Sequence, residues 1–372
     1  MNMDKSRRKF VRKNVLLASS IPLASSFGFN ILKGVPKEDL IVGHGDFRYK
    51  VDKKWGELDP TKVPVDNCHE MVIDSKGRII LLTDQPKNNL IIYDQKGNLI
   101  DAFCNRFPGG HGLTINDEGG EEFLYITDNG WFHDHKNPDD WKYFSGNGFV
   151  SKITMKGELV FNLGHPQTIG IYEPTMPFKP SETAIAPNGD IYVADGYGSN
   201  YIIQYDQYGK YIRHFGGRDN PDPNYRFKTA HGVTLDTRNP DDLQLIITSR
   251  EECAFKFFTL EGVHKKTVTI PGAMVNRAVI HGKNIYAGVC WSQIDGKAKD
   301  GTGYITILNE NDKVVSNPGG QKPTYKKGEL QYQIQETPFL RHGHDVCVDN
   351  DENVYVCQWN GGRTYPMKLE RI

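Results

Sequence analysis

The sequence predicts an all-β protein, and more specifically a six-bladed β-propeller. A unit of four short strands recurs from about residue 65 to the end of the chain, and six such units fill this stretch. The composition agrees, because 18 Tyr, 18 Phe, 38 Gly and 20 Pro in 372 residues are typical of a turn-rich β-protein. A β-sandwich is the alternative fold, but it gives no reason for six matching units.

Each unit begins with a short apolar strand, turns at a cluster of Asp, Asn or Gly, and continues with a strand of β-branched and aromatic residues. Two further strands follow, the last of them after a Gly turn that requires a positive φ. These glycines are Gly97, Gly157, Gly209 and Gly262. The units open at His69, His111, Glu182, His231, Asn276 and His344.

Two units carry insertions, and the last unit is short. Residues 131–147 are inserted in the second unit and residues 291–303 in the fifth. The sixth unit ends at Ile372 after three strands, so its fourth strand has to come from elsewhere in the chain. Arg48–Trp55 is the natural donor, and we expect it to close the ring within the last blade. This gives an N-terminal segment at 27–64 and the propeller at 65–372.

The first 26 residues have the pattern of an export signal. Ser6–Lys13 is basic and contains the pair Arg7 and Arg8, and Val15–Phe29 is modestly apolar with small residues at 24–26 that suit cleavage. This resembles a twin-arginine signal and predicts a periplasmic protein. The apolar stretch is too short and too rich in Ser for a stable membrane span. The alternative is a basic tail on a cytosolic protein.

Charge and cysteine content narrow the classes of partner. The formal net charge is −1, and residues 1–26 hold six Lys or Arg against one Asp, so the remainder has 39 basic and 45 acidic residues and a net charge of −6. No basic patch of the size that nucleic acid requires is visible, and nucleic acid is therefore not an expected partner. Six cysteines without a CxxC spacing are compatible with disulfides in an oxidising compartment. We expect a monomer.

The residues that open the units are the candidate metal ligands. The innermost strand of a blade starts at one face of a propeller, so the opening residues should lie around the axis at that mouth. Four of the six are His, and the others are Glu182 and Asn276. Imidazoles from separate strands suit Zn²⁺ with an open coordination position, although iron, manganese or copper would accept the same donors. The alternative is that these side chains only fill the channel.

Second strands end at the same mouth, and the inserted loops lie beside it. These ends bring Asp84, Tyr197, Arg250 and Trp359, with Arg363 near the last of them. The insertions add Trp131, His133, His135 and Trp291. Long loops over a rigid scaffold often carry function, so we expect them to wall a pocket.

Several motifs resemble known families. Ile191–Asp206 resembles the NHL repeat. Gly110–Ile115, Ala230–Leu235 and Gly343–Val346 are similar to the three zinc-histidine segments of the peptidylglycine amidating lyases, and Asp195–Tyr197 and Thr248–Glu251 to that family's tyrosine and arginine segments. The resemblance covers about residues 110–360.

This resemblance implies a zinc-dependent lyase that cleaves an α-hydroxyglycine-extended peptide. His111, His231 and His344 would hold the ion, with His69 as an additional imidazole. Tyr197 would be the general base, its phenol pKa lowered by nearby positive charge, and Arg250 would steady the tyrosinate or a substrate carboxylate. Asp345 would help hold a structural Ca²⁺.

The sequence also departs from the family. Thr83–Gln85 stands where a second arginine is expected, and His342 replaces a Met. We therefore expect lyase-type C–O or C–N cleavage of a different substrate, a small anionic or hydroxylated molecule, a short peptide or a saccharide. The remaining candidate pocket residues are Glu182, Asn276, His342, Trp359 and Arg363.

Three other functions stay open. A lactonase would share the propeller, but its calcium would prefer a ring of Glu, Asn and Asp to one of His. A carbohydrate β-elimination lyase also fits Tyr, Arg and a His-held metal. A non-enzymatic NHL binding module would bind no stoichiometric metal, and metal content therefore separates it from the enzymes.

Overall fold

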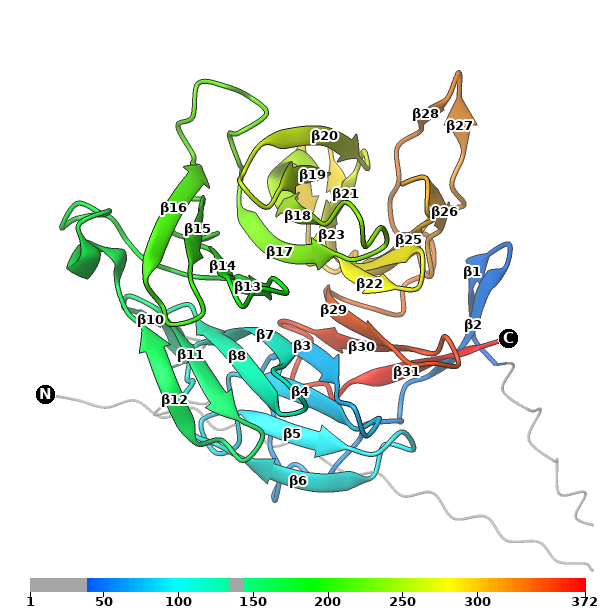
Figure 1. Cartoon of the computed structure of the whole chain (residues 1–372). Coiled ribbons are helices and arrows are strands. Elements are labelled where there is room, and N and C mark those ends of the chain that lie inside the picture. Colours follow the sequence, from blue (N-terminus) through cyan, green and yellow to red (C-terminus); the bar gives the residue numbers. More distant parts are fainter. Residues whose placement is uncertain (1–38, 134–142) are drawn as a thin grey trace, which may run out of the picture. The chain divides into compact units, whose positions relative to one another are not determined.

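Antiparallel sheets follow one another in sequence order around a central axis and form a six-bladed β-propeller (Figure 1). The computed structural model describes residues 39–133 and 143–372, and the predicted export signal lies outside them. Residues 39–372 form one unit. Within each blade the strands run from the axis outward, and the predicted fold class is confirmed.

The first four blades each have a core of four strands. Blade 1 consists of β3 (Cys68–Ile73), β4 (Ile79–Thr83), β5 (Leu90–Tyr93) and β6 (Leu99–Phe103). Blade 2 consists of β7 (Gly110–Asp117), β8 (Glu122–Asp128), β11 (Phe149–Thr154) and β12 (Leu159–Leu163). Blade 3 consists of β13 (Glu182–Ile185), β14 (Ile191–Ala194), β15 (Tyr201–Tyr205) and β16 (Tyr211–Gly216). Blade 4 consists of β17 (Ala230–Asp236), β18 (Gln244–Ser249), β19 (Ala254–Thr259) and β20 (His264–Thr269).

Blade 5 is more elaborate, because its innermost strand is broken into β21 (Ala273–Val275) and β22 (Val279–His281). Both pieces pair with the long β23 (Asn284–Ile294), which also pairs with β24 (Lys297–Lys299). The blade is completed by β25 (Tyr304–Leu308) and β26 (Val314–Ser316). The break leaves residues 276–278 outside the assigned strands, although the backbone N–H of Asn276 still donates to the Gly288 oxygen of β23 at 2.9 Å.

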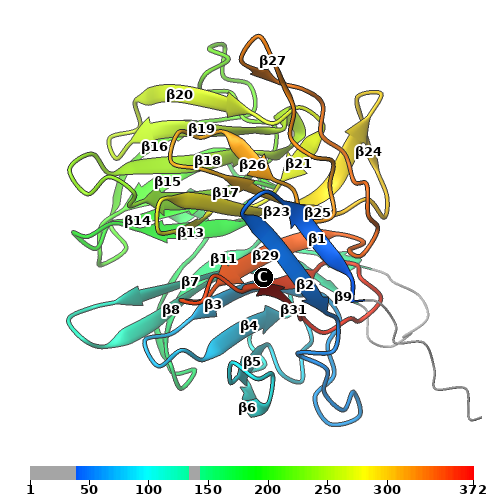
Figure 2. The same ribbon diagram turned by 90° about the vertical axis from the view of Figure 1, so that its right-hand side faces the viewer.

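Blade 6 joins the two ends of the described chain. Its order is β29 (Gly343–Val348), β30 (Val354–Gln358), β31 (Met367–Arg371), β2 (Phe47–Asp52) and β1 (Ile41–His44). The pairing of β2 with β31 confirms that an N-terminal strand closes the ring (Figures 1 and 2). The sequence did not predict β1, which adds a fifth strand at the outer edge.

The inserted segments form hairpins. β9 (Trp131–His133) pairs with β10 (Tyr143–Ser145) in blade 2, and β23 with β24 extends blade 5. A third hairpin, β27 (Tyr325–Lys326) with β28 (Glu329–Leu330), was not expected. Two short 3₁₀ helices complete the described elements, η1 (Pro166–Ile169) and η2 (Arg250–Glu252).

The predicted Gly turns have the predicted backbone. The φ angles of Gly97, Gly157, Gly209 and Gly262 are 85°, 82°, 82° and 85°. At Gly97 a Cβ atom would lie 1.7 Å from the backbone oxygen of Trp55, so no other residue fits there without displacing the neighbouring chain.

The core lies between neighbouring blades. Inner strands such as β4 (Ile79–Thr83) are buried along their whole length, because each blade packs on both faces. A buried aromatic or branched side chain contributes about 1.5–3 kcal/mol to this packing. All six cysteines are free thiols in this structure. Within the described ranges, no helix is both long enough and apolar enough to cross a bilayer.

Candidate functional site

Four histidines lie at the same local irregularity, a shift of register at the start of an innermost strand. The shift falls between Cys68 and Glu70, Gly110 and Gly112, Ala230 and Gly232, and Gly343 and Asp345. The residue passed over in each case is His69, His111, His231 and His344. A β-bulge adds one residue to a strand and re-aims its side chain. The bulges therefore give four blades the same means of turning an imidazole toward the axis.

The four imidazole rings lie together at the mouth of the channel. Neighbouring ring centroids are 4.8–5.1 Å apart. His69, His111 and His344 each offer a ligand atom, and these atoms lie within 4.8 Å of one another. His231 does not belong to this group of three, although its ring centroid is 4.8 Å from that of His111. The histidine ring that the sequence predicted is therefore assembled, and the candidate ligand triad includes His69.

Backbone oxygens fix the tautomers of two of these rings. Nδ1 of His111 donates to the Ser181 oxygen at 2.8 Å, and Nδ1 of His344 donates to the His69 oxygen at 2.8 Å. A carbonyl oxygen only accepts, so Nδ1 carries a proton in both rings, and in the neutral form Nε2 carries the lone pair. Burial and the neighbouring positive groups lower the pKa of His111 and of His344 well below the usual range. Both imidazoles are therefore neutral and suited to bind a metal ion.

The other two imidazoles also have nitrogens available. Nε2 of His69 lies 3.4 Å from Oδ2 of Asp84, while its Nδ1 is buried without a partner. Burial tends to raise the pKa of Asp84, but hydrogen bonds from His69 and Asn67 outweigh it and the pKa is lowered. Both ring nitrogens of His231 are buried without a partner, and burial and Arg250 lower its pKa well below the usual range.

Tyr197 and Arg250 adjoin the imidazoles. Arg250 Nη2 donates to the Tyr197 hydroxyl at 3.1 Å, and Nη1 donates to Oδ1 of Asn276 at 3.2 Å. The hydroxyl lies 3.1 Å from His111 Nε2. Because that nitrogen is an acceptor, Tyr197 donates to it. Burial raises the pKa of Tyr197, and Arg250 only partly opposes this. Positive charge from Arg250 does act to lower this pKa, as predicted, but the loss of hydration is the larger effect and the pKa is raised overall.

A cavity of about 320 Å³ opens above the imidazoles. Three tryptophans, Trp131, Trp291 and Trp359, wall it together with Tyr197. The Arg250 guanidinium lies 5.5 Å from the Tyr197 ring centroid and 5.3 Å from that of Trp291, so this cation is held between aromatic faces. The remaining lining residues are His69, Asp84, Gly109, His111, Asn129 and His344. The inserted hairpins thus supply the predicted wall through Trp131 and Trp291.

Most of the other candidate pocket residues lie elsewhere. Trp359 lines the cavity. Asn276 is fully buried and supports Arg250, and His342 lies behind Trp359, hydrogen-bonding its backbone oxygen at 3.1 Å and Asp300 at 2.8 Å. Arg363 pairs with Asp66 at 3.2 Å beside a separate small cavity. His135 lies outside the described residues.

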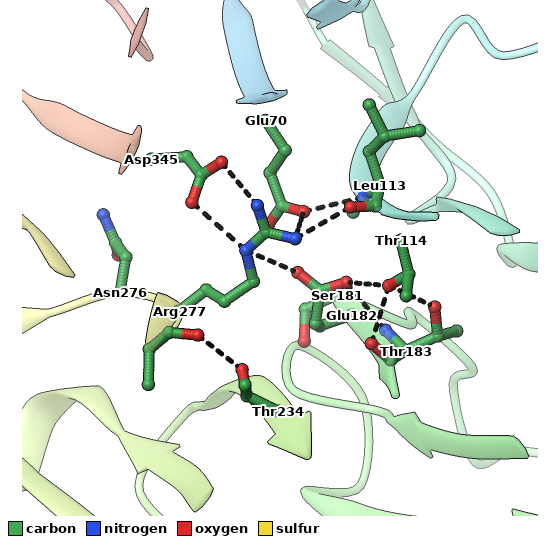
Figure 3. Close-up of polar contacts among 12 residues, drawn as sticks. Glu70, Leu113, Thr114, Ser181, Glu182, Thr183, Thr234, Asn276, Arg277 and Asp345 are labelled. Carbon is green, nitrogen blue, oxygen red and sulfur yellow. Dashed lines mark hydrogen bonds and ion pairs between the residues drawn. The ribbon is translucent and has the colours of Figure 1, made fainter. Parts of the chain in front are cut away.

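Glu182 and Asp345 are placed deeper in the channel than the imidazoles. β13 pairs with β14 without a register shift, so Glu182 is not turned into the mouth as the histidines are. Both carboxylates face Arg277, at 3.7 Å and 2.7 Å (Figure 3). Sequence reasoning missed Arg277 and Glu70. The available signal was a single charged residue within an otherwise apolar inner-strand sequence.

Comparisons with known proteins agree with this architecture. No protein-family model matches the chain. A 185-residue stretch, 49% of the chain, is 26% identical to 46% of the "Probable peptidyl-alpha-hydroxyglycine alpha-amidating lyase" of Caenorhabditis elegans. A 198-residue stretch, 51% of the chain, is 25% identical to 51% of NHL repeat-containing protein 3 of Homo sapiens. The chain thus spans about half the length of the curated relatives it matches.

Solved structures share the fold at low identity. A streptogramin B lyase matches with a TM-score of 0.53 at 13% identity, over 87% of this chain and 97% of that one. A catalytically inactive virginiamycin B lyase from Staphylococcus aureus with quinupristin matches with a TM-score of 0.51 at 15% identity, over 87% of this chain and 100% of that one. The chain is a six-bladed β-propeller distantly related to the amidating lyases and to NHL-repeat proteins.

Proposed function

We propose that this protein is a metal-dependent lyase-type enzyme that acts on a small anionic or hydroxylated molecule at the pocket. The observation that carries the proposal is that neutral imidazoles, a tyrosine hydroxyl and a guanidinium line one aromatic-walled cavity of about 320 Å³. The amidating-lyase name of a relative supports the reaction class.

The donor set fits a divalent transition metal, with zinc as the first choice. His69, His111 and His344 supply three nitrogens, and zinc sites in enzymes commonly use three protein ligands and leave a fourth position open. His231 adjoins them and has two unpartnered nitrogens, so it is a further candidate ligand. When bound, the ion would supply Lewis-acid polarisation of a substrate oxygen and positive charge beside Tyr197.

Tyr197 is proposed as the proton-transfer residue. His111 Nε2 cannot accept the Tyr197 hydrogen bond and serve as a metal ligand with the same lone pair. In the metal-bound enzyme the hydroxyl would therefore be released toward the pocket. As the phenolate, Tyr197 would take a proton from the substrate while the C–O or C–N bond breaks. The departing oxygen or nitrogen would keep the electron pair of that bond, and the Tyr197 phenol would return the proton to it. Arg250, 3.1 Å away, would stabilise the phenolate through a charge-assisted hydrogen bond.

The pocket favours a ring-shaped substrate with one anionic group. Trp131, Trp291 and Trp359 offer flat faces for stacking, and Arg250 is the cation among the lining residues. Asp84, at the position where the resemblance expects a second arginine, orients His69 instead of binding an anion. The tryptophan wall supports a second candidate, β-elimination from a saccharide, in which Tyr197 would remove the proton next to a carboxylate.

Elemental analysis of the purified protein tests the metal, with one tightly bound transition metal per chain expected. His111→Ala should weaken metal binding by more than about 100-fold, since loss of even an outer partner of a ligand typically costs 10–100-fold. His264→Ala, on the outer strand β20, is the matched control and should keep the metal.

Two product assays separate the reactions. Glyoxylate release indicates amidating-type cleavage, and a new ultraviolet absorbance indicates an unsaturated product of β-elimination. A purified protein with no bound metal, none acquired on addition, and no product in either assay would refute the proposal.

A further inference from the structure

We propose that the guanidinium of Arg277 is a built-in cation that occupies the axial channel in place of a divalent metal ion. Arg277 lies in the break between β21 and β22 of blade 5, and its side chain is 10% exposed. Figure 3 shows its guanidinium in the middle of Glu70, Leu113, Glu182 and Asp345. This inference concerns the channel below the imidazoles and does not depend on the proposed function.

Each nitrogen of the guanidinium contacts two oxygens. Nε lies 3.2 Å from Oδ1 of Asp345 and 3.7 Å from Oε2 of Glu182. Nη1 donates to the Leu113 oxygen at 2.7 Å and pairs with Oε2 of Glu70 at 3.2 Å. Nη2 donates to the Met71 oxygen at 3.1 Å and to Oδ2 of Asp345 at 2.7 Å. Among the described residues, the hydrogen-bond and ion-pair partners of this cation are thus all carboxylate or carbonyl oxygens, and they come from four other blades.

This donor set is the kind that a hard divalent cation takes. Ca²⁺ binds six to eight oxygens from carboxylates and backbone carbonyls. Three carboxylates that are at most 1% exposed, with two carbonyl oxygens, would form such a shell if the guanidinium were absent. The expected structural Ca²⁺ at Asp345 therefore does not fit this chain, because Arg277 already pairs with both oxygens of that carboxylate.

The guanidinium also connects the innermost strands on the side of the imidazoles that faces away from the pocket. Glu70 and Asp345 directly follow His69 and His344, and Leu113 is two residues after His111. By binding these three residues, Arg277 connects the innermost strands that carry the candidate metal ligands. It also lines a cavity of about 380 Å³ formed by the far halves of the inner strands.

The charge balance predicts what removal of this side chain would do. Truncation of Arg277 would leave three buried carboxylates without a cation, which is strongly unfavourable. A divalent ion could then enter the vacated oxygen shell and replace the positive charge that was removed. Arg277→Ser opens this space, whereas Arg277→Met removes the charge but fills the space.

Thermal unfolding with and without Ca²⁺ tests the inference. The unaltered protein should have the same Tm with excess EGTA as with millimolar CaCl₂, and it should bind no Ca²⁺ in a calorimetric titration. Arg277→Ser should lower the Tm by on the order of 5 °C or more in EGTA. Millimolar CaCl₂ should recover most of that loss, with one Ca²⁺ bound per chain.

Two further variants serve as controls and show which results would overturn the inference. Arg277→Met should be destabilised equally in both conditions, and adding Asp345→Asn to Arg277→Ser should abolish the recovery. If Arg277→Ser folds only when Ca²⁺ is present during refolding, the inference is supported. A native protein that loses stability in EGTA, or an Arg277→Ser variant that neither binds Ca²⁺ nor folds better with it, would overturn the inference.

Discussion

Replacing Tyr197 with Phe tests whether the Tyr197 hydroxyl and the metal ion compete for the same lone pair on His111 Nε2. The change removes one hydroxyl that donates to His111 Nε2 and accepts from Arg250 Nη2, each at 3.1 Å. It leaves the ring between His111 and Trp131, whose centroids lie 5.2 Å and 4.8 Å away. The wall of the pocket should therefore persist, and the effect should be limited to the lost hydroxyl.

Two opposite effects are expected from Tyr197→Phe. Loss of a proton-transfer group should lower kcat by about 10²–10⁴-fold. Metal affinity should rise, because the metal-free protein no longer gains a Tyr–His hydrogen bond that metal binding has to break. Such a bond is worth about 0.5–1.5 kcal/mol, which corresponds to about twofold to tenfold in Kd.

The assays are turnover of whichever substrate the product screen identifies and competition for the metal with a chromophoric chelator. Tyr211→Phe is the control, since it removes another Tyr–His hydrogen bond, 2.9 Å to His214, from the outer strand of blade 3. Weaker metal binding by Tyr197→Phe would contradict a competition between the Tyr197 hydroxyl and the metal ion for His111 Nε2. Unchanged kcat would remove Tyr197 from the reaction.

Three other perturbations have defined outcomes. Asp84→Asn should weaken metal binding by about 10–100-fold, because His69 loses the carboxylate that orients it. Competition with a chelator measures the change in affinity. An unchanged affinity would exclude His69 as a ligand. Tyr49 in β2 is fully buried, so Tyr49→Ala should lower the free energy of unfolding by about 3–5 kcal/mol in urea titrations. Arg48 is exposed, and Arg48→Ala should leave the free energy of unfolding almost unchanged. Equal effects of the two substitutions would contradict closure of the ring through β2. Arg7→Lys with Arg8→Lys should retain the protein in the cytoplasm upon cell fractionation, since the paired arginines are the feature read for export; normal export would argue against a twin-arginine signal.

Strand counting was sufficient to predict the closing strand. A sixth unit of three strands requires a donor, and the stretch Arg48–Trp55 was the natural one before the first unit. β1 (Ile41–His44) could not be inferred in the same way, because a blade that is already complete does not require a fifth strand. The sequence thus predicts the strand that is required to complete the last blade, but it does not predict an additional strand at the outer edge of that blade.

Position matching predicted the histidine ring but misplaced Glu182. The matching treated every unit as if its strands paired regularly, whereas four units have a bulge at the opening residue and the third does not. A bulge depends on the pairing of two strands, so it is not visible in the sequence of one. Arg277 was missed for a similar reason, since its partners come from four other blades.

The pKa of Tyr197 shows which electrostatic property of the site could not be predicted from the sequence. The sequence indicated a nearby arginine, and the structure confirms that Arg250 contacts the hydroxyl. The direction of the shift also depends on how completely the phenol is removed from water, which the sequence does not reveal. Burial is the larger cause here, and the pKa is raised.

The pairing of β2 with β31 has a consequence for biosynthesis. Tyr49 is opposite Arg371, so the ribosome must add about 320 residues after β2 before its partner exists, which takes roughly 15–60 s at typical elongation rates. During that interval one side of β2 is an unpaired strand edge, the kind of surface that invites wrong pairing with other chains. Because the five-residue strand Met367–Arg371 completes the ring, closure should have to wait until this strand has been synthesised, and a nascent chain lacking it should remain open and depend on chaperones.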